Sequence, residues 1–248
     1  MFLIYYIFVS NCLAVNNRKQ RTIMLKKLDI LGLELDNYTV REAMFNVETY
    51  LNNDVMNTVE TISMRMIEQA GGDEVMHNCL QELDLAVIGE KEILTAAGAA
   101  STQRIRETVE NEFFLEFMKR LIRNKKTVYL LGQTADAVER LYSFLQDEYE
   151  KVKIVGQYAM ETCIGDLDAV VNAINMETPD VIFSVLPSPY QEHFLEDNRG
   201  KLSARVWYGL GEHYAADEKV HSPLRWMRRI IRRKKLTNRL NEYNNNEK

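Results

Sequence analysis

The chain has 248 residues, of which 46% are hydrophobic and 27% charged, and its formal net charge is −5. This length fits one large domain or two small ones, and the ordinary composition, with only 4 Pro and 11 Gly, excludes a disordered, collagen-like or repeat protein. Three scattered cysteines without CxxC spacing, and four histidines without HxxxH or HExxH spacing, argue against a zinc site and a disulfide framework. The cysteine usage favours a reducing compartment.

The first 15 residues, MFLIYYIFVSNCLAV, are apolar. The run is shorter than the roughly 20 residues of a membrane-spanning helix, and it lacks a basic start and an A-x-A-type cleavage site. We therefore expect Met24 to be the true initiator and residues 1–23 to be an over-long start. A weak membrane anchor is the alternative.

Short apolar segments alternate with amphipathic ones from residue 28 onward, which predicts strands alternating with helices. The expected strands are 28–35, 57–62, 84–88, 127–131, 153–155, 181–185 and 204–210. The expected helices are 39–51, 73–83, 90–100, 108–123, 135–149, 166–175 and one that begins at Tyr190. Thr39 and Glu42 form a capping box at the start of the first helix. The alternation predicts one α/β domain over residues 24–221, with a Rossmann-like, mostly parallel sheet and helices on both faces.

The strand at 127–131 ends in Gly132, just before a helix. Such a turn brings backbone amides to a helix N-terminus, which is a natural place for phosphate. A single glycine is neither a GxGxxG nor a Walker motif, so a glycine that merely eases the turn is the alternative.

The segment PDVIFSVLPSPYQE, residues 179–192, joins a strand buried on both faces to a proline-rich loop. Open α/β sheets bind ligands at the carboxyl ends of their strands, so Gln191 stands where an amide could bind a sugar hydroxyl or a uracil edge. The alternative is that Gln191 and Glu192 are solvated residues of a first helical turn, with Glu192 favoured there by the helix dipole.

Residues 221–248 hold nine Lys/Arg and two Glu, although the whole chain is acidic. Ser222-Pro223 is a helix start signal, and apolar residues then recur on one face beside a dense basic face. This pattern predicts a basic amphipathic helix and polar tail over 222–248 that lies on an anionic membrane surface. The residues expected to contact the membrane are Arg225, Arg228, Arg229, Arg232, Arg233, Lys234 and Lys235. A solvated or subunit-contact helix is an alternative; nucleic acid is disfavoured, because no nucleic-acid module accompanies the helix.

From Leu28 onward, the chain resembles the WecG/TagA/CpsF glycosyltransferases over nearly its whole length. The segments that carry the resemblance are ILGLELDNYTVREA, TVYLLG, PDVIFSVLPSPYQE, GLG at 209–211 and SPLRWMRR at 222–229. Their order and spacing are specific, although no single segment is.

The resemblance implies transfer of an N-acetylhexosamine, of the N-acetylmannosamine kind, from a UDP-sugar to a polyprenyl-diphosphate-linked sugar in cell-wall or surface-polysaccharide synthesis, for example of teichoic acid. It implies an inverting, metal-independent enzyme without a cofactor besides its UDP-sugar substrate. The protein would be cytoplasmic and peripheral to the inner face of the cell membrane. The resemblance leaves the oligomeric state open, with a homo-oligomer as one alternative.

The catalytic motif departs from the family pattern. The family's L-P-D-G, whose Asp is the expected general base, appears here as Val87-Ile88-Gly89-Glu90, so Glu90 is the candidate base with a one-residue shift. The T-x-N-P-E segment retains Thr61 but has Ser63 in place of Asn. The P-K-Q-E segment has Tyr190 in place of Lys, and the basic residue after the catalytic region falls on Arg106, or less well on Arg104. The resemblance thus assigns the substrate to Thr61, Ser63, Arg106, Gly132, Pro189, Gln191 and Glu192.

Two hypotheses follow. The protein is either a working glycosyltransferase with Glu90 as base, or a catalytically degenerate member that binds a nucleotide-sugar, a lipid-linked glycan or a partner enzyme at the membrane. A structural α/β domain with a vestigial pocket is a third reading, because a fold alone does not fix a function.

Overall fold

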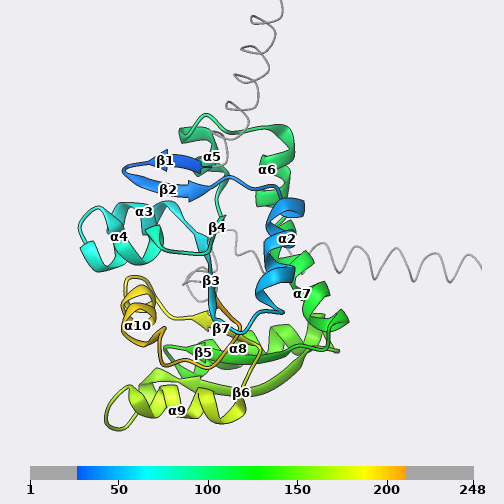
Figure 1. The fold of residues 1–248 in the computed structure, drawn as a ribbon, viewed down its shortest axis with the longest axis vertical. Helices are drawn as coiled ribbons and strands as arrows, with labels where there is room; N and C mark the ends of the chain where they lie inside the picture. The colour runs from blue at the N-terminus through cyan, green and yellow to red at the C-terminus, as the bar shows by residue number, and fades with distance from the viewer. Residues whose placement is uncertain (1–26, 211–248) are drawn as a thin grey trace, which may run out of the picture.

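The computed structural model describes residues 27–210 (Figure 1). The expected N-terminal extension 1–23 and the basic helix and tail 222–248 lie outside the described residues, as do the expected domain limits.

Six strands form the central sheet, and every pairing in it is parallel. The strands are β3 (Asn57–Ile62), β4 (Leu85–Ile88), β5 (Thr127–Gly132), β6 (Lys153–Ala159), β7 (Val181–Val185) and β8 (Val206–Gly209). Their order across the sheet is β4-β3-β8-β7-β5-β6. The predicted α/β class and parallel sheet are confirmed, and the strands predicted at 57–62 and 181–185 have the predicted bounds.

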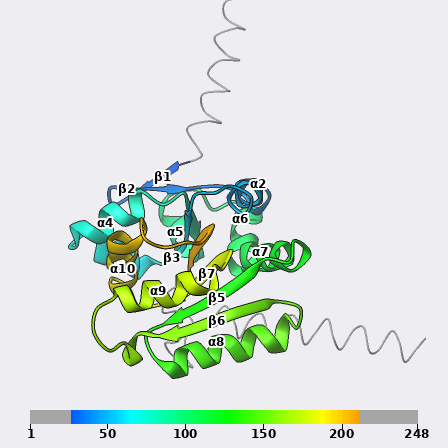
Figure 2. The ribbon, with the colours of Figure 1, turned by 60° about the horizontal axis from the view of Figure 1, so that its bottom comes forward.

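Helices cover both faces of this sheet. They are α2 (Val40–Tyr50), α3 (Met64–Ala70), α4 (Glu74–Gln81), α5 (Lys91–Ala96), α6 (Thr102–Val109), α7 (Glu112–Arg123), α8 (Ala135–Glu148), α9 (Asp168–Glu177) and α10 (Tyr190–Asn198). One apolar core joins α2, α7 and α8 to one face of the sheet, while two others join α3, α4, α5, α9 and α10 to the opposite face. Figure 2 shows α8 and α9 on opposite sides of β5 and β6.

Successive residues of each strand face opposite cores, because side chains alternate along a strand. Val59 and Tyr208 belong to the core of α7, whereas Ile62 and Trp207 belong to the cores of the other face. Glu60 therefore lies on the face that α10 covers, and Thr61 lies on the face that α7 covers.

The single strand predicted at 28–35 is wrong. These residues form an antiparallel hairpin of β1 (Lys27–Ile30) and β2 (Leu33–Asp36), outside the main sheet. Leu31 and Gly32 turn the chain with φ values of 54° and 87°, as in a type I′ hairpin turn. Asp36 Oδ2 accepts a hydrogen bond of 3.0 Å from the Ala86 amide, so the hairpin ties to edge strand β4.

Helix 108–123 was predicted as one element, but the structure has α6 and α7 there, separated at Asn111 with φ 44°. The strand predicted at 153–155 continues through Gly156 to Ala159, and the helix predicted at 90–100 ends at Ala96. The predicted capping box of Thr39 and Glu42 on α2 is confirmed, and Asp73 caps α4.

Candidate active site

The chain reverses its direction of winding at β5, which has β6 on one side and β7 on the other. In open α/β sheets, ligands bind at such switch points, beyond the carboxyl ends of the strands. Most of the predicted site residues follow strand ends: Ser63 follows β3, Glu90 follows β4, and Pro189 and Gln191 follow β7. The structure separates these residues into three groups.

The first group lies where β3 and β4 end. Ser63 is the N-cap of α3, because its Oγ accepts a hydrogen bond of 3.2 Å from the Met66 amide. Glu90 Oε2 accepts a hydrogen bond of 3.3 Å from the Met64 amide of the same helix end. The structure thus brings Glu90 and Ser63 together at the start of α3, as an acceptor-rich group at the sheet edge.

Thr61 takes part in this group from the other face of the sheet. Its Oγ1 lies 3.1 Å from the hydroxyl oxygen of Tyr208, and Tyr208 is fully buried. Burial raises the pKa of the Tyr208 hydroxyl, so that hydroxyl stays neutral. Thr61 is only partly buried, and its methyl group packs beside Gly89.

Gly89 has no space for a side chain. A Cβ atom there would lie 2.7 Å from Thr61 Cγ2 and 2.9 Å from the carbonyl oxygen of Ile62. The Gly89 amide also donates a hydrogen bond of 2.9 Å to that same carbonyl. Glycine therefore fits the close approach of β4 to β3, and the only carboxylate at this turn is that of Glu90.

The second group is buried beneath α10. Gln191 and Glu192 are both 0% exposed, which overturns the alternative that they are solvated residues of a first helical turn. Gln191 Nε2 donates a hydrogen bond of 3.3 Å to Glu60 Oε1, and Ser188 donates one of 2.7 Å to Glu192 Oε1. Tertiary packing decided this burial, because α10 turns its first residues toward the sheet.

Sheet register explains how Gln191 reaches β3. Glu60 of β3, Gly209 of β8 and Ser184 of β7 stand side by side across three strands. Because Gly209 has no side chain, the Gln191 carboxamide fits over it: a Cβ at Gly209 would lie 2.6 Å from Gln191 Nε2 and 2.8 Å from Glu60 Cγ.

Glu60 was not singled out from the sequence, although a carboxylate within the otherwise uncharged strand NTVETI is a usable signal. Glu60 is 0% exposed, and it has no cationic partner within residues 27–210. Burial, followed by the nearby Glu192 carboxyl, raises the pKa of Glu60 well above its usual value. Burial likewise raises the pKa of Glu192.

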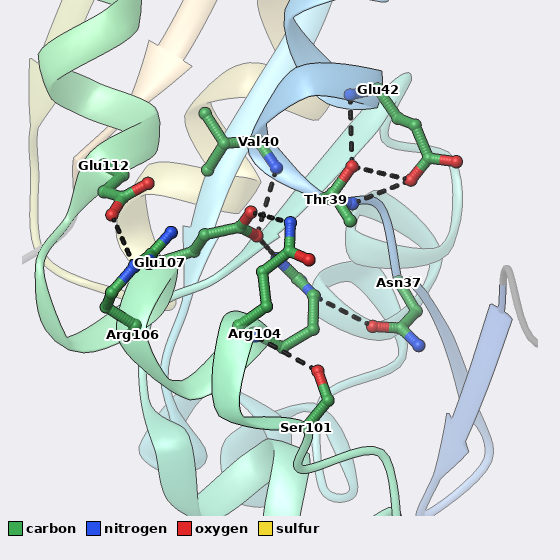
Figure 3. Close-up of polar contacts among 10 residues, drawn as sticks. Asn37, Thr39, Val40, Glu42, Ser101, Arg104, Arg106, Glu107 and Glu112 are labelled. Atoms are coloured by element: carbon green, nitrogen blue, oxygen red, sulfur yellow. Dashed lines mark hydrogen bonds and ion pairs between the residues drawn. The ribbon is translucent and has the colours of Figure 1, made fainter.

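Arg106 of α6 points toward Glu112 at the start of α7 (Figure 3). Its Nε donates a hydrogen bond of 3.1 Å to Glu112 Oε1, and its side chain is 59% exposed. Arg104, the alternative, has a structural role, because it forms an ion pair with buried Glu107 at 2.9 Å. Glu107 also accepts a hydrogen bond from the Val40 amide of α2. Of the two arginines, Arg106 is the one whose side chain is accessible to a substrate.

The third group lies at the end of β5. Gly132 is buried against Val138 and Val185. The first amide of α8, that of Ala135, already donates a hydrogen bond to Glu161 Oε1 at 2.6 Å. A carboxylate therefore occupies the position where phosphate was expected, which supports the alternative that Gly132 eases the turn. A cavity of about 520 Å³ lies beside this helix end, lined by Ala135, Asp136, Val138, Glu139, Gln157, Tyr158, Ala159 and Thr162.

Pro189 stands directly before α10 at its N-cap position, and the Gln191 amide donates to the Pro187 carbonyl at 2.9 Å. Among residues 27–210, no cluster of three or more His, Cys, Asp and Glu side chains could hold a metal ion. Within the same residues, none of the helices has both the length and the apolar character needed to cross a bilayer.

Comparisons with known proteins agree with the resemblance in sequence. A model of the glycosyl transferase WecG/TagA/CpsF family matches residues 28–231. An N-acetylglucosaminyldiphosphoundecaprenol N-acetyl-beta-D-mannosaminyltransferase of Staphylococcus aureus strain NCTC 8325 / PS 47 is 24% identical over 193 residues, which are 75% of this chain and 73% of the relative. The protein of the same description from strain MRSA252 has the same identity and coverage.

Proposed function

Because the chain belongs to the WecG/TagA/CpsF family of glycosyltransferases, we propose that it transfers an N-acetylhexosamine from a UDP-sugar to a polyprenyl-diphosphate-linked acceptor. The similar Staphylococcus aureus enzymes are described as transferring N-acetylmannosamine to N-acetylglucosaminyldiphosphoundecaprenol. An acceptor and a sugar of the same chemical class are proposed for this chain. The product belongs to cell-wall polymer synthesis.

One observation carries the proposal: the Glu90 carboxylate stands beside Ser63, at the carboxyl ends of the adjacent strands β3 and β4. In the proposed reaction, Glu90 takes the proton of the acceptor hydroxyl. The hydroxyl oxygen then forms a bond to the anomeric carbon while the bond from that carbon to UDP breaks, which inverts the anomeric centre.

We propose that polar groups near the carboxyl ends of β3 and β4 bind the UDP-sugar donor. Thr61 and the accessible Arg106 are proposed to contact the UDP-sugar directly, while Ser63, which is buried and caps α3, is proposed to position this edge of the sheet. Gln191 and Glu192 are buried, so their proposed part is to fix the loop at 186–189 beside the donor. The reaction is proposed to need neither metal nor cofactor, and transfer is expected to persist in the presence of a chelator.

A catalytically degenerate binding protein is the second candidate. It is favoured by the crowding at Gly89, where the resemblance puts the family's catalytic Asp, and by the bond that engages Glu90 with α3. Such a protein would bind the UDP-sugar or a partner at the membrane without transferring the sugar.

Two measurements separate the candidates. The first is a thermal-shift titration with UDP, UDP-N-acetylglucosamine and UDP-N-acetylmannosamine, in which a ligand at about 100 times its dissociation constant stabilises the fold by roughly 2.7 kcal/mol. The second is a transfer assay on Glu90→Gln, with Glu92→Gln as the control, because Glu92 lies on α5 but its side chain is 61% exposed.

A functioning enzyme with Glu90 as base is expected to lose about 10²–10⁴-fold in rate in Glu90→Gln and nothing in Glu92→Gln. Transfer that survives Glu90→Gln would remove Glu90 from the mechanism. UDP-sugar binding without transfer in the wild type would favour the degenerate reading, and absence of both would overturn the proposal.

A further inference from the structure

Two carboxyl groups lie in the protein interior where α10 meets the sheet. Glu60 and Glu192 are each 0% exposed, and neither forms an ion pair within residues 27–210. Each has one oxygen, Oε2, without a hydrogen-bond partner there, as has Gln191 at Oε1. Two unpaired negative charges in such a place are strongly disfavoured. Burying an ionised carboxylate in a low dielectric costs more free energy than protonating the carboxylate to its neutral form.

The geometry assigns the neutral state to Glu60. Its Oε1 accepts a hydrogen bond from Gln191 Nε2, and the Trp207 indole acts on the same carboxyl, but residues 27–210 give it no cation and no backbone amide to balance a charge. Glu192 has more support, because the Ser188 hydroxyl donates to it and it stands in the first turn of α10. Among residues 27–210, the titratable groups around the pair include Cys79 of α4, whose thiol pKa burial raises and on which Glu196 and Arg199 also act, and His193, which pairs with Asp73 at 2.8 Å.

The contact between Gln191 and Glu60 bears on the loop at 186–189, which follows the carboxyl end of β7. The Gln191 amide donates to Pro187, the His193 amide donates to Pro189, and the Ser188 hydroxyl donates to Glu192. These three bonds join the loop after β7 to the first turn of α10. The bond between Gln191 and Glu60 then fixes that turn to β3, the strand that leads into Thr61 and Ser63.

We propose that Glu60 is a positioning residue, held as a neutral acid, that fixes Gln191 and thereby the loop at 186–189 against the donor-binding edge of the sheet. This inference rests on the proposed function, the transfer of a sugar from UDP. Glu60 touches no substrate and acts through Gln191. Glu60 directly precedes Thr61 in β3, and Gln191 follows β7. The contact between Glu60 and Gln191 therefore connects the carboxyl ends of these two strands.

The test compares Glu60→Gln with Glu60→Met. Glutamine has the shape of the neutral acid and keeps both an acceptor for Gln191 and a donor, whereas methionine keeps the volume and removes the acceptor. Glu60→Gln is expected to bind UDP-N-acetylhexosamine as the wild type does, and Glu60→Met about tenfold more weakly, because Gln191 is left with an unsatisfied buried donor.

Amide hydrogen exchange without ligand gives a second measurement. The amides of Gln191 and His193 are expected to exchange about tenfold faster in Glu60→Met and at the wild-type rate in Glu60→Gln. If Glu60→Met fails to fold, Gln191→Met removes the other partner and is expected to raise the same exchange rates.

The outcomes distinguish this inference from the proposed function. Equal loss of protection in Glu60→Gln and Glu60→Met would overturn it, since an ionised or merely space-filling Glu60 is then indicated. Unchanged protection in Glu60→Met would overturn it as well. If the wild type binds no UDP-sugar, the proposed function fails, while exchange rates that separate the two variants would still support Glu60 as the residue that fixes the loop.

Discussion

Gly89 approaches Ile62 so closely that a Cβ atom on Gly89 would lie 2.9 Å from the Ile62 carbonyl oxygen. The same carbonyl accepts the Gly89 amide at 2.9 Å, so the two backbones are held at this separation. An acid at position 89 would therefore have to push β4 away from β3. The carboxylate closest along the chain is that of the next residue, Glu90.

Restoring an acid at that position is expected to damage the fold rather than to improve the enzyme. Gly89→Asp should lower the free energy of unfolding by about 1–3 kcal/mol, as overpacking of a close contact does, and should leave the rate of transfer no higher than in the wild type. Urea unfolding and the transfer assay measure the two effects. A variant with wild-type stability and faster transfer would contradict the close packing described above.

Alanine at Gly209 is expected to expel the Gln191 carboxamide. The added Cβ would lie 2.6 Å from Gln191 Nε2 and 2.9 Å from Glu60 Oε1, so we expect Gly209→Ala to lose about 1–3 kcal/mol of stability and to bind UDP-sugar more weakly. Gly200→Ala is the matched control, because nothing lies within 4 Å of a Cβ there. Equal stabilities of the two variants, by urea unfolding, would refute the expectation.

The stability of the protein is expected to fall as pH rises above the ordinary range of a glutamic acid. The folded state holds a proton on Glu60, and burial raises the pKa values of both Glu60 and Glu192, while the unfolded state releases these protons at lower pH. Since the folded state then binds more protons, stability decreases with pH between the unfolded and folded pKa values.

The limiting slope of that decrease is about a tenfold change in the folding equilibrium constant for each pH unit and each proton. Urea unfolding from pH 5 to pH 8 measures it for the wild type and for Glu60→Gln. The variant should show a smaller decrease, since it cannot release a proton at position 60. An identical pH dependence in the two proteins would remove Glu60 as its source.

The two arginines of α6 are expected to differ in what they support. Arg104→Met leaves the Glu107 carboxylate buried at 5% exposure without its cation, and it should cost about 3–5 kcal/mol of stability. Arg106→Met removes an exposed pair and should cost about 1 kcal/mol or less, but it should weaken UDP-sugar binding. Thermal unfolding and ligand titration of both variants decide this, and a stable Arg104→Met would show that the buried pair is dispensable.

The basic segment 222–248 is expected to bind anionic membranes. Each Lys or Arg near such a surface contributes about 1 kcal/mol at moderate salt, so the full chain should sediment with vesicles that contain phosphatidylglycerol and not with neutral ones. A chain that ends at residue 221 should remain in the supernatant with both. Equal sedimentation of the two chains would assign any membrane binding to another part of the protein.

Local sequence signals predicted much of the fold. The apolar, β-branched runs at 57–62 and 181–185 gave strands with the expected bounds, and the Thr39 and Glu42 box placed the start of α2. The signals failed where conformation depended on a short turn. Leu31-Gly32 divides an apolar stretch into two strands, and Asn111 divides α6 from α7, although the surrounding periodicity is continuous.

The candidate site was predicted less completely. The motif segments led to Glu90, Thr61 and Ser63, and the structure places them at adjacent strand ends. They also led to Gln191 and Glu192, but as groups open to ligand or solvent, whereas both are buried. Glu60 was missed, because its partner is 131 residues away in the chain.

The sequence by itself determined the family, the alternation of strands and helices and the absence of an acid at position 89, because these depend on residue types and their order. Only the tertiary structure decided that Gly89 has no space for an acid and that Gln191 is turned inward to Glu60. Both depend on the register of parallel strands, in which residues far apart in the chain come within hydrogen-bond distance. Neither propensity nor periodicity along the chain records that register.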